Sequence, residues 1–165
     1  VEAANAAVYR AAQLDSAKKG MGTTMTALWM GKDSVCLAHV GDSRAYLLRN
    51  GALMQLSRDH SLVGELMEKG ELTPEEAMVH PQRNLITRAL GPDADAQCDG
   101  YICPLEVGEY LLLCTDGLVN TVTDQEMLFE VIHGTEPDSC LDRMMEIAKR
   151  QGAPDNVTAV LMGRL

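Results

Sequence analysis

The sequence has few aromatic residues and no long apolar segment. One Trp, four Tyr and one Phe make up 4% of the 165 residues, whereas Met occurs ten times. The core is therefore expected to be mainly aliphatic, with Met side chains filling irregular gaps. No run approaches the roughly 18 apolar residues that a membrane-spanning helix requires, so no membrane partner is expected. With 46% hydrophobic and 23% charged residues, the composition is that of one globular domain over residues 1–165.

Basic residues are also scarce. Fourteen Lys and Arg face 24 Asp and Glu, which gives a net charge of −10. Between Asp93 and Asp142 there are twelve acidic residues and no Lys or Arg. Such a surface does not neutralise phosphates, so nucleic acid is not an expected partner. Most of these acids are expected to be solvated surface groups, while a few can converge on cations.

The five cysteines lack the spacing of a zinc site. Cys98 and Cys103 are separated by four residues, and no pair of His residues accompanies them. Cys36 and Cys114 lie in apolar runs, where a reduced Cys behaves as a small hydrophobic residue. Residues 1–4 do not resemble a signal peptide. We therefore expect a reducing compartment, the cytoplasm.

Hydrophobic patterns and turn signals predict both helices and strands. Helical spacing and capping signals predict helices over 3–14, 62–69, 123–132 and 137–151, and a short one after Thr73. Alternation predicts strands over 23–30, 34–40, 44–48, 52–56, 101–104, 109–114 and 156–162, with hairpin turns at 31–33 and Asn50-Gly51. Residues 84–90 fit a helix or a strand equally well. Consecutive strands with helices grouped apart from them predict an α+β fold, in which helices pack against antiparallel sheet.

Three aspartates occur at predicted strand ends, each beside a Gly or Asn. They are Asp42, Asp116 and Asp155. If the three converge, their charges repel and raise each other's pKa, a conflict that a bound divalent cation resolves. Ligation by oxygen alone favours Mg²⁺ or Mn²⁺ over Zn²⁺. For any one of the three taken alone, the simple turn that Asp-Gly or Asp-Asn makes is the favoured interpretation.

Six short motifs follow one another along the chain: Gly22-Thr23-Thr24, His39-Val40-Gly41-Asp42-Ser43-Arg44-Ala45-Tyr46, Asp59-His60-Ser61, Ile86-Thr87-Arg88-Ala89-Leu90-Gly91, Cys114-Thr115-Asp116-Gly117-Leu118 and Asp155-Asn156-Val157-Thr158. In this order they resemble the metal-dependent protein serine/threonine phosphatases of type 2C, specifically the compact bacterial branch. The resemblance implies an antiparallel β-sandwich flanked by helices, with a metal cluster at one end. It also implies that metal-activated water hydrolyses phosphoserine or phosphothreonine in proteins, without a phosphoenzyme intermediate.

The resemblance assigns roles to five residues. Asp116 and Asp155 match the aspartates that hold the first metal, and Asp42 matches the one that shares a third, looser metal with Asp116. Two or three Mn²⁺ or Mg²⁺ ions are therefore expected, and no catalytic residue beyond the metal ligands is identified. Asn156 and Gly117 adjoin ligands and are expected to orient them.

Several other polar residues near these motifs are expected to be structural. A packing role is favoured over phosphate binding for Arg44 and over proton transfer for His39. His60 is expected to anchor the following helix rather than to shuttle protons. Residues 61–90 fall where the family has its flap, a mobile segment that influences substrate access.

The sequence also departs from the family pattern. The family's early segment has a phosphate-gripping Arg, an acidic pair and an Asp-Gly-x-Gly-Gly loop whose Asp bridges two metals, and none of these occurs in this chain. Residues 19–23 are superficially similar to that loop, but Lys19 replaces the essential acid, and their place directly before Thr24 marks them as the ordinary Gly-Thr-Thr start of a strand. We therefore expect the C-terminal part of a phosphatase domain without its N-terminal segment. This chain alone would be inactive or weakly active, and its unpaired strand edges would favour self-association.

Two other functions remain open at this point. The first is a non-catalytic, phosphatase-like module that binds partners or phosphopeptides. The second is the related group of phosphatases that act on anti-sigma-factor antagonists, which the flap-like helices after Asp59-His60 match less well. The leading interpretation is a cytoplasmic enzyme that acts on phosphoproteins.

Overall fold

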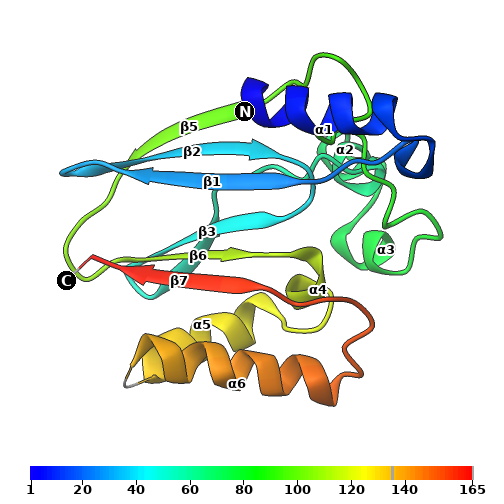
Figure 1. Ribbon diagram of the computed structural model, residues 1–165. Coiled ribbons are helices and arrows are strands. Elements are labelled where there is room, and N and C mark those ends of the chain that lie inside the picture. Colours follow the sequence, from blue (N-terminus) through cyan, green and yellow to red (C-terminus); the bar gives the residue numbers. More distant parts are fainter. Residues whose placement is uncertain (135, 165) are drawn as a thin grey trace. The chain divides into compact units, whose positions relative to one another are not determined.

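The computed structural model describes residues 1–134 and 136–164, which form two compact units (Figure 1). Unit 1 consists of residues 1–31, 35–42 and 58–102. Unit 2 consists of residues 32–34, 43–57 and 103 onward. Each unit contains one antiparallel sheet with its own helices, as the α+β prediction requires. The assignment of residues 1–165 to one phosphatase-like domain stays a prediction.

The sheet of unit 1 has the strand order β1-β2-β5. β1 (Met25–Met30) pairs antiparallel with β2 (Ser34–Val40), which confirms the first predicted hairpin. β5 (Asp99–Pro104) lies on the other side of β2. Alternate residues of β2 are buried, and His39 is among them despite its polar ring.

Helix α1 (Glu2–Leu14) is fixed within unit 1 by one buried amide side chain. Asn5 Nδ2 donates hydrogen bonds to the carbonyl oxygens of Asp93 and Ala94, at 3.1 and 2.9 Å. Its Oδ1 accepts one from the Gly91 amide, at 2.8 Å. Because Asn5 satisfies three backbone groups of a distant turn, it holds α1 against residues 91–94. The short 3₁₀ helix η1 (Ser16–Lys18) follows α1.

The middle of unit 1 contains two short helices that begin as their caps predict. Ser61 accepts a hydrogen bond from the Gly64 amide at the start of α2 (Leu62–Glu68). Thr73 and Glu76 form a complete capping box before α3 (Pro74–Met78).

The undecided stretch 84–90 is neither a helix nor a strand. It makes two isolated bridges instead, one between Ile86 and Ser61 and one between Leu90 and Thr23. The whole of 61–90 lies in unit 1, and its role as a flap stays a prediction.

The sheet of unit 2 has the strand order β4-β3-β6-β7, with all neighbours antiparallel. Its strands are β3 (Arg44–Arg49), β4 (Ala52–Gln55), β6 (Tyr110–Cys114) and β7 (Ala159–Gly163). Asn50 and Gly51 both have positive φ, 54° and 73°, as a tight hairpin turn between β3 and β4 requires. This turn is confirmed as the sequence predicts it.

Three helices belong to unit 2: α4 (Asp116–Val119), α5 (Asp124–His133) and α6 (Pro137–Arg150). Helices α5 and α6 cover one face of the sheet (Figure 1). The core between these helices and the sheet is mainly aliphatic and contains several sulfur atoms, as the composition predicts, and Tyr46 is the aromatic residue among its buried members. These buried members are Tyr46, Leu48, Leu112, Cys114, Leu118, Val122, Met127, Val131, Met144 and Ala148. The predicted capping box of Thr123 and Glu126 is present, whereas α4 was not expected. Among the described residues, no helix combines the length and apolar character needed to cross a membrane.

Candidate metal centre

Two loops of unit 2 are joined just beyond the paired ends of β6 and β7. The last ladder pair is Cys114 opposite Ala159. Past it, the Thr115 amide donates to the Thr158 carbonyl oxygen and the Thr158 amide donates to Thr115 Oγ1, both at 3.0 Å. The Thr115 hydroxyl in turn donates to the carbonyl oxygen of Asn156, at 3.3 Å. These three bonds hold the β6–α4 loop beside the α6–β7 loop.

Two of the predicted metal ligands, Asp116 and Asp155, lie on these adjoining loops. Asp116 is the first residue of α4 and is half-buried, while Asp155 is exposed. Asp116 Oδ1 accepts a hydrogen bond from the Gly117 amide at 2.9 Å. Asp155 Oδ1 accepts one from the Asn156 amide at 2.7 Å. In each loop, the backbone amide that follows the aspartate therefore orients its carboxylate.

Gly117 permits the two loops to approach closely. A Cβ atom at this position would overlap the carbonyl oxygen of Asn156 and lie 3.0 Å from its carbonyl carbon. It would also lie 3.3 Å from a methyl carbon of Val157. Since backbone atoms cannot rotate away as side chains do, a larger residue would push the loops apart.

The third predicted ligand, Asp42, belongs to unit 1 and lies two residues after the end of β2 at Val40. It is half-buried and comes after Gly41, whose φ of 117° is a conformation that other residues rarely adopt. The structure thus brings Asp116 and Asp155 onto adjoining loops of one unit and places Asp42 in the other. Among the residues described, no three or more His, Cys, Asp or Glu side chains are grouped closely enough to hold a metal ion. The three-aspartate site stays a prediction.

The donor chemistry of the two joined loops fits a hard divalent cation. Asp116 and Asp155 supply carboxylate oxygens, and the peptide groups beside them supply carbonyl oxygens. Mg²⁺ and Mn²⁺ prefer this type of ligand, whereas Zn²⁺ prefers His and Cys.

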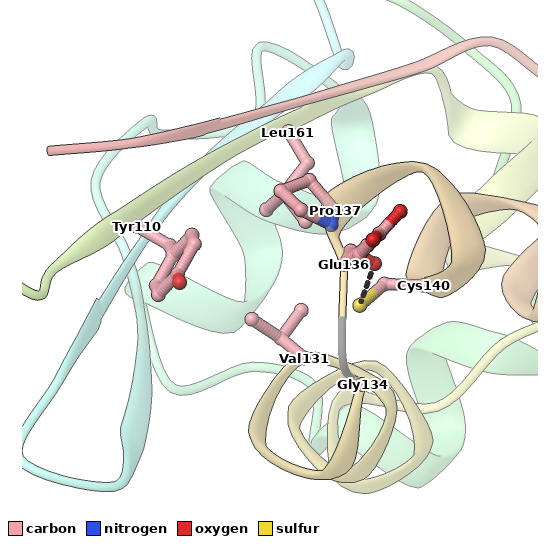
Figure 2. Close-up of a pocket in the computed structure, with 7 residues that line it drawn as sticks. All are labelled: Tyr110, Val131, Gly134, Glu136, Pro137, Cys140 and Leu161. Atoms are coloured by element: carbon pink, nitrogen blue, oxygen red, sulfur yellow. Dashed lines mark hydrogen bonds between the residues drawn. The ribbon is translucent and has the colours of Figure 1, made fainter. Parts of the chain in front are cut away.

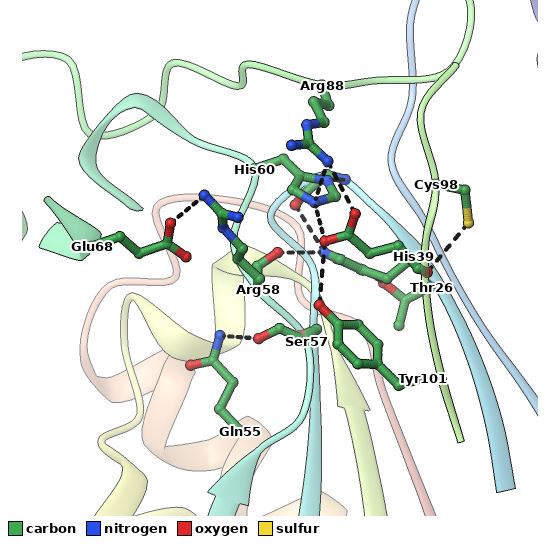
Figure 3. Close-up of polar contacts among 12 residues, drawn as sticks. Thr26, His39, Gln55, Ser57, Arg58, His60, Glu68, Arg88, Cys98 and Tyr101 are labelled. Carbon is green, nitrogen blue, oxygen red and sulfur yellow. Dashed lines mark hydrogen bonds and ion pairs between the residues drawn. The ribbon is translucent and has the colours of Figure 1, made fainter. Parts of the chain in front are cut away.

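The polar side chains near β2 form a buried network in unit 1 (Figure 3). His39 is fully buried: its Nδ1 lies 3.0 Å from Thr26 Oγ1, and its Nε2 lies within 3.0 Å of the carbonyl oxygens of Gly41 and Arg58. Burial, followed by the nearby His60, lowers the pKa of His39. Both ring nitrogens are engaged with protein groups, which supports the packing role that we expected.

Arg44 likewise has a partner consistent with a packing role. Its Nη1 donates a hydrogen bond to the hydroxyl of buried Tyr46, at 3.1 Å. Burial raises the pKa of Tyr46 above its ordinary value, so this phenol stays protonated at neutral pH.

One acidic residue of this network was missed at the sequence level. Asp99, at the start of β5, accepts hydrogen bonds from His60 Nε2 at 3.1 Å and from Arg88 Nη1 at 3.0 Å. It lies 39 positions from His60 along the chain. No spacing pattern in a single sequence relates two residues so far apart, so this contact is identified only from the folded structure.

A small cavity in unit 2 is lined by Tyr110, Val131, Gly134, Glu136, Pro137, Cys140 and Leu161 (Figure 2). Its volume of about 20 Å³ has room for a single water molecule. Cys140, at its edge, donates a hydrogen bond to the Glu136 carbonyl oxygen at 3.1 Å. A substrate pocket is more than ten times larger, at about 300 Å³ or above, so this cavity is not a candidate substrate site.

This chain is similar to bacterial protein phosphatases both in sequence and in structure. The protein phosphatase 2C family model matches residues 1–162. The serine/threonine phosphatase stp of Listeria welshimeri is 41% identical over 157 residues, which cover 95% of this chain and 62% of that protein. The crystal structure of serine/threonine phosphatase Stp1 from Staphylococcus aureus superposes with a TM-score of 0.94 at 37% identity, covering 99% of this chain and 64% of that one.

A further similar structure contains metal. The catalytic domain of serine/threonine protein phosphatase PstP in complex with two manganese ions has a TM-score of 0.89 and 37% identity to this chain. The match covers 98% of this chain and 66% of that one. These similarities confirm the predicted fold class, antiparallel sheets flanked by helices as in type 2C phosphatases. The chain spans about 62% of the length of the Listeria protein that it matches.

Proposed function

Because this chain belongs to the protein phosphatase 2C family, we propose that it forms part of a metal-dependent enzyme that hydrolyses phosphoserine and phosphothreonine in proteins. One structural observation carries the proposal. The hydrogen bonds of Thr115 hold Asp116 and Asp155 on adjoining loops, each carboxylate oriented by the next amide. Paired carboxylates at strand ends are suited to hold a cation at a fixed place on a rigid sheet.

In this proposal, Asp116 and Asp155 hold the principal cation, Mn²⁺ or Mg²⁺, and Asp42 contributes to a more weakly held ion in a set of two or three. When bound, a divalent cation lowers the pKa of water and neutralises charge on phosphoryl oxygens. Residues of this chain hold the two carboxylates in position. The amides of Gly117 and Asn156 fix the carboxylates, and Thr115 fixes the distance between their loops.

The 165-residue chain is expected to do little of this chemistry alone. Its sequence contains no Asp-Gly-x-Gly-Gly motif, which the family resemblance implies as the source of the bridging carboxylate. We propose that it hydrolyses phosphopeptides weakly at most and that it self-associates in solution. Its five cysteines, all within the described residues, are thiols, which supports a reducing compartment such as the cytoplasm.

The test of the catalytic assignment uses the full-length protein and a phosphothreonine peptide with increasing Mn²⁺. Asp116→Ala and Asp155→Ala should each abolish phosphate release at every Mn²⁺ concentration, because each removes a ligand of the principal cation. Asp42→Ala should instead raise the Mn²⁺ concentration needed for half-maximal activity. Asp95→Ala, which changes an exposed acid in a loop of unit 1, is the control and should behave as wild type.

Wild-type turnover by Asp116→Ala at saturating Mn²⁺ would contradict the assignment. Binding of the phosphopeptide without turnover by the full-length wild type would favour the non-catalytic module instead. For the 165-residue chain itself, light scattering and the same assay measure association and residual activity. A monomer with the full turnover of the longer protein would refute that part of the proposal.

A further inference from the structure

The polar backbone atoms of Gly41 are all hydrogen-bonded within unit 1. Its amide donates to His60 Nδ1 at 3.0 Å. Its carbonyl oxygen accepts from the His60 amide at 2.8 Å and from His39 Nε2 at 3.0 Å. Gly41 is buried, and a Cβ atom there would overlap the side chain of Thr24. These hydrogen bonds therefore fix the backbone at Gly41, the residue directly before Asp42.

Two of these bonds join the same pair of residues. The Gly41 amide and carbonyl both contact His60, one through the imidazole and one through the backbone. A doubly bonded pair of this kind resembles one rung of an antiparallel ladder, with the ring nitrogen replacing a carbonyl oxygen. His60 thus gives Gly41, the residue that follows β2, a partner of the kind that a neighbouring strand supplies within a sheet.

The hydrogen bonds also define the tautomer of His60. An amide can only donate, so Nδ1 must accept from Gly41 and cannot carry a proton. The ring proton therefore sits on Nε2, where it is donated to Asp99 Oδ2 at 3.1 Å. Only 2% of His60 is exposed, so water does not compete for these bonds.

Asp99 is itself held by two further side chains. Tyr101 Oη donates to Oδ2 at 3.2 Å, and Arg88 Nη1 donates to Oδ1 at 3.0 Å. Burial alone raises the pKa of Asp99, but the hydrogen bond from His60, with the charge of Arg88 and the hydrogen bond from Tyr101, outweighs it and leaves this pKa below its ordinary value. A continuous chain of contacts therefore runs from β5 through Asp99 and His60 to Gly41. Figure 3 labels His60 together with Arg88 and Tyr101, the two side chains that also hold Asp99.

We propose that His60, oriented by Asp99, is a positioning residue that sets the direction in which the chain leaves β2 at Asp42. In the folded protein, this fixes where the Asp42 carboxylate is presented and so determines the affinity of the cation that it helps to hold. The link to cation affinity rests on the proposed function. The effect on the backbone of residues 41–42 does not.

The backbone effect is measured by hydrogen exchange of the Gly41 amide, using NMR on the full-length protein. His60→Ala removes the acceptor, so Gly41 exchange should accelerate about tenfold or more, the change expected for one lost buried hydrogen bond. His60→Asn has an oxygen near the position of Nδ1 and should restore part of the protection. Asp99→Asn keeps an acceptor for Nε2–H and should give an intermediate result.

His133→Ala is the matched control. It removes an exposed imidazole of α5 that lies 2.9 Å from the Phe129 carbonyl oxygen and stacks on the Phe129 ring, and it should leave Gly41 exchange unchanged. If His60→Ala does not fold, His60→Asn and Asp99→Asn, compared with wild type, decide the question. Wild-type exchange at Gly41 in the folded His60 and Asp99 variants would overturn the proposal.

The second measurement is the broadening of amide resonances by added Mn²⁺ at Asp42, Asp116 and Asp155. In His60→Ala, the Mn²⁺ concentration that broadens Asp42 should rise about 10- to 100-fold, the usual effect of losing a residue that orients a ligand. Broadening at the other two aspartates should stay as in wild type. An unchanged response at Asp42 would overturn the link to cation affinity. A lack of broadening at Asp116 and Asp155 in the wild type would instead count against the proposed function, and Gly41 exchange would still decide the role of His60.

Discussion

Replacing Gly117 by Ala adds one methyl group where two loops meet. The new carbon would overlap the carbonyl oxygen of Asn156 and lie 3.0 Å from its carbonyl carbon. Carbon atoms in favourable contact are about 3.5 to 4.0 Å apart, so the loops must separate by about 1 Å. The hydrogen bond from Thr115 Oγ1 to Asn156 is already 3.3 Å long and should break first.

The size of the effect follows from these contacts. Forcing an extra methyl group into a packed site costs about 1 to 3 kcal/mol, and a lost hydrogen bond adds about 1 kcal/mol. For a chain of this length, each kcal/mol lowers the melting temperature by about 2 to 4 °C. Because the displaced loops carry Asp116 and Asp155, Mn²⁺ affinity should also fall, by about 10- to 100-fold.

Three measurements on the full-length protein test this reasoning. They are thermal unfolding, Mn²⁺ titration by calorimetry, and hydrogen exchange of the Thr158 amide, which is bonded to Thr115 Oγ1 at 3.0 Å. The control is Gly100→Ala, because a Cβ at Gly100 meets no atom within 4 Å and the backbone there does not have positive φ. If Gly117→Ala matched both wild type and this control in all three measurements, the close approach of the loops would have no energetic consequence, and the argument would be wrong.

Three further substitutions probe other parts of the fold. Asn5→Ala removes three hydrogen bonds to backbone groups, one of which, the Gly91 amide, is buried, and should destabilise the protein by about 2 to 4 kcal/mol in urea unfolding, whereas a loss under 0.5 kcal/mol or so would show that α1 is held by other contacts. Thr123→Ala removes the cap of α5 and should lower stability by about 1 kcal/mol, with no change in Mn²⁺ affinity. The pKa of His39 is lower in the folded protein than in the unfolded chain, so the unfolded chain binds a proton there more readily. The contribution of neutral His39 to the free energy of unfolding is therefore complete above about pH 6.5 and is lost as the pH falls through the pKa of the folded protein. The urea midpoint should therefore fall less between pH 7.5 and 5.5 in His39→Gln than in wild type, and parallel decreases would contradict this.

Elements with strong local signals were predicted from the sequence. Thr73 and Thr123 each stand three residues before a Glu, and both helices begin there with complete capping boxes. Asn50-Gly51 forms a tight turn because both residues adopt positive φ. In these cases the residues that define the structure are neighbours in the chain, so one sequence is enough.

Helix α4 was missed because the side chain of its N-cap residue bonds to a distant loop instead of capping the helix. Thr115 is the N-cap residue, but its side chain makes no capping hydrogen bond. The hydroxyl donates to Asn156 and accepts from Thr158 instead, 41 and 43 positions away. Because α4 has four residues and no local cap, it depends on the adjoining loop for its stability. In the sequence, the pair Asp116-Gly117 by itself predicts only a turn.

The residues of the candidate site and of the buried network also differ in whether a local sequence signal identifies them. Asp116 and Asp155 were identified because each has a characteristic neighbour in the sequence, and the structure adds the bonds that join their loops. Asp99 has no such neighbour, and the backbone of residues 84–90 pairs with distant residues at two isolated bridges. What the sequence does not contain is the pairing between segments that are remote along the chain.

The two glycines beside candidate ligands serve different purposes, and this determines how each site responds to change. Gly41 precedes Asp42 and is needed for its positive φ, so His60 can fix the backbone only while a glycine stands there. Gly117 follows Asp116 and is needed for the space that it leaves to Asn156. Strain at Gly41 is therefore local and acts on the direction of one carboxylate, whereas strain at Gly117 separates two loops and acts on both of their carboxylates. Substitution at Gly117 should accordingly weaken the principal cation site, and substitution at Gly41 only the site that includes Asp42.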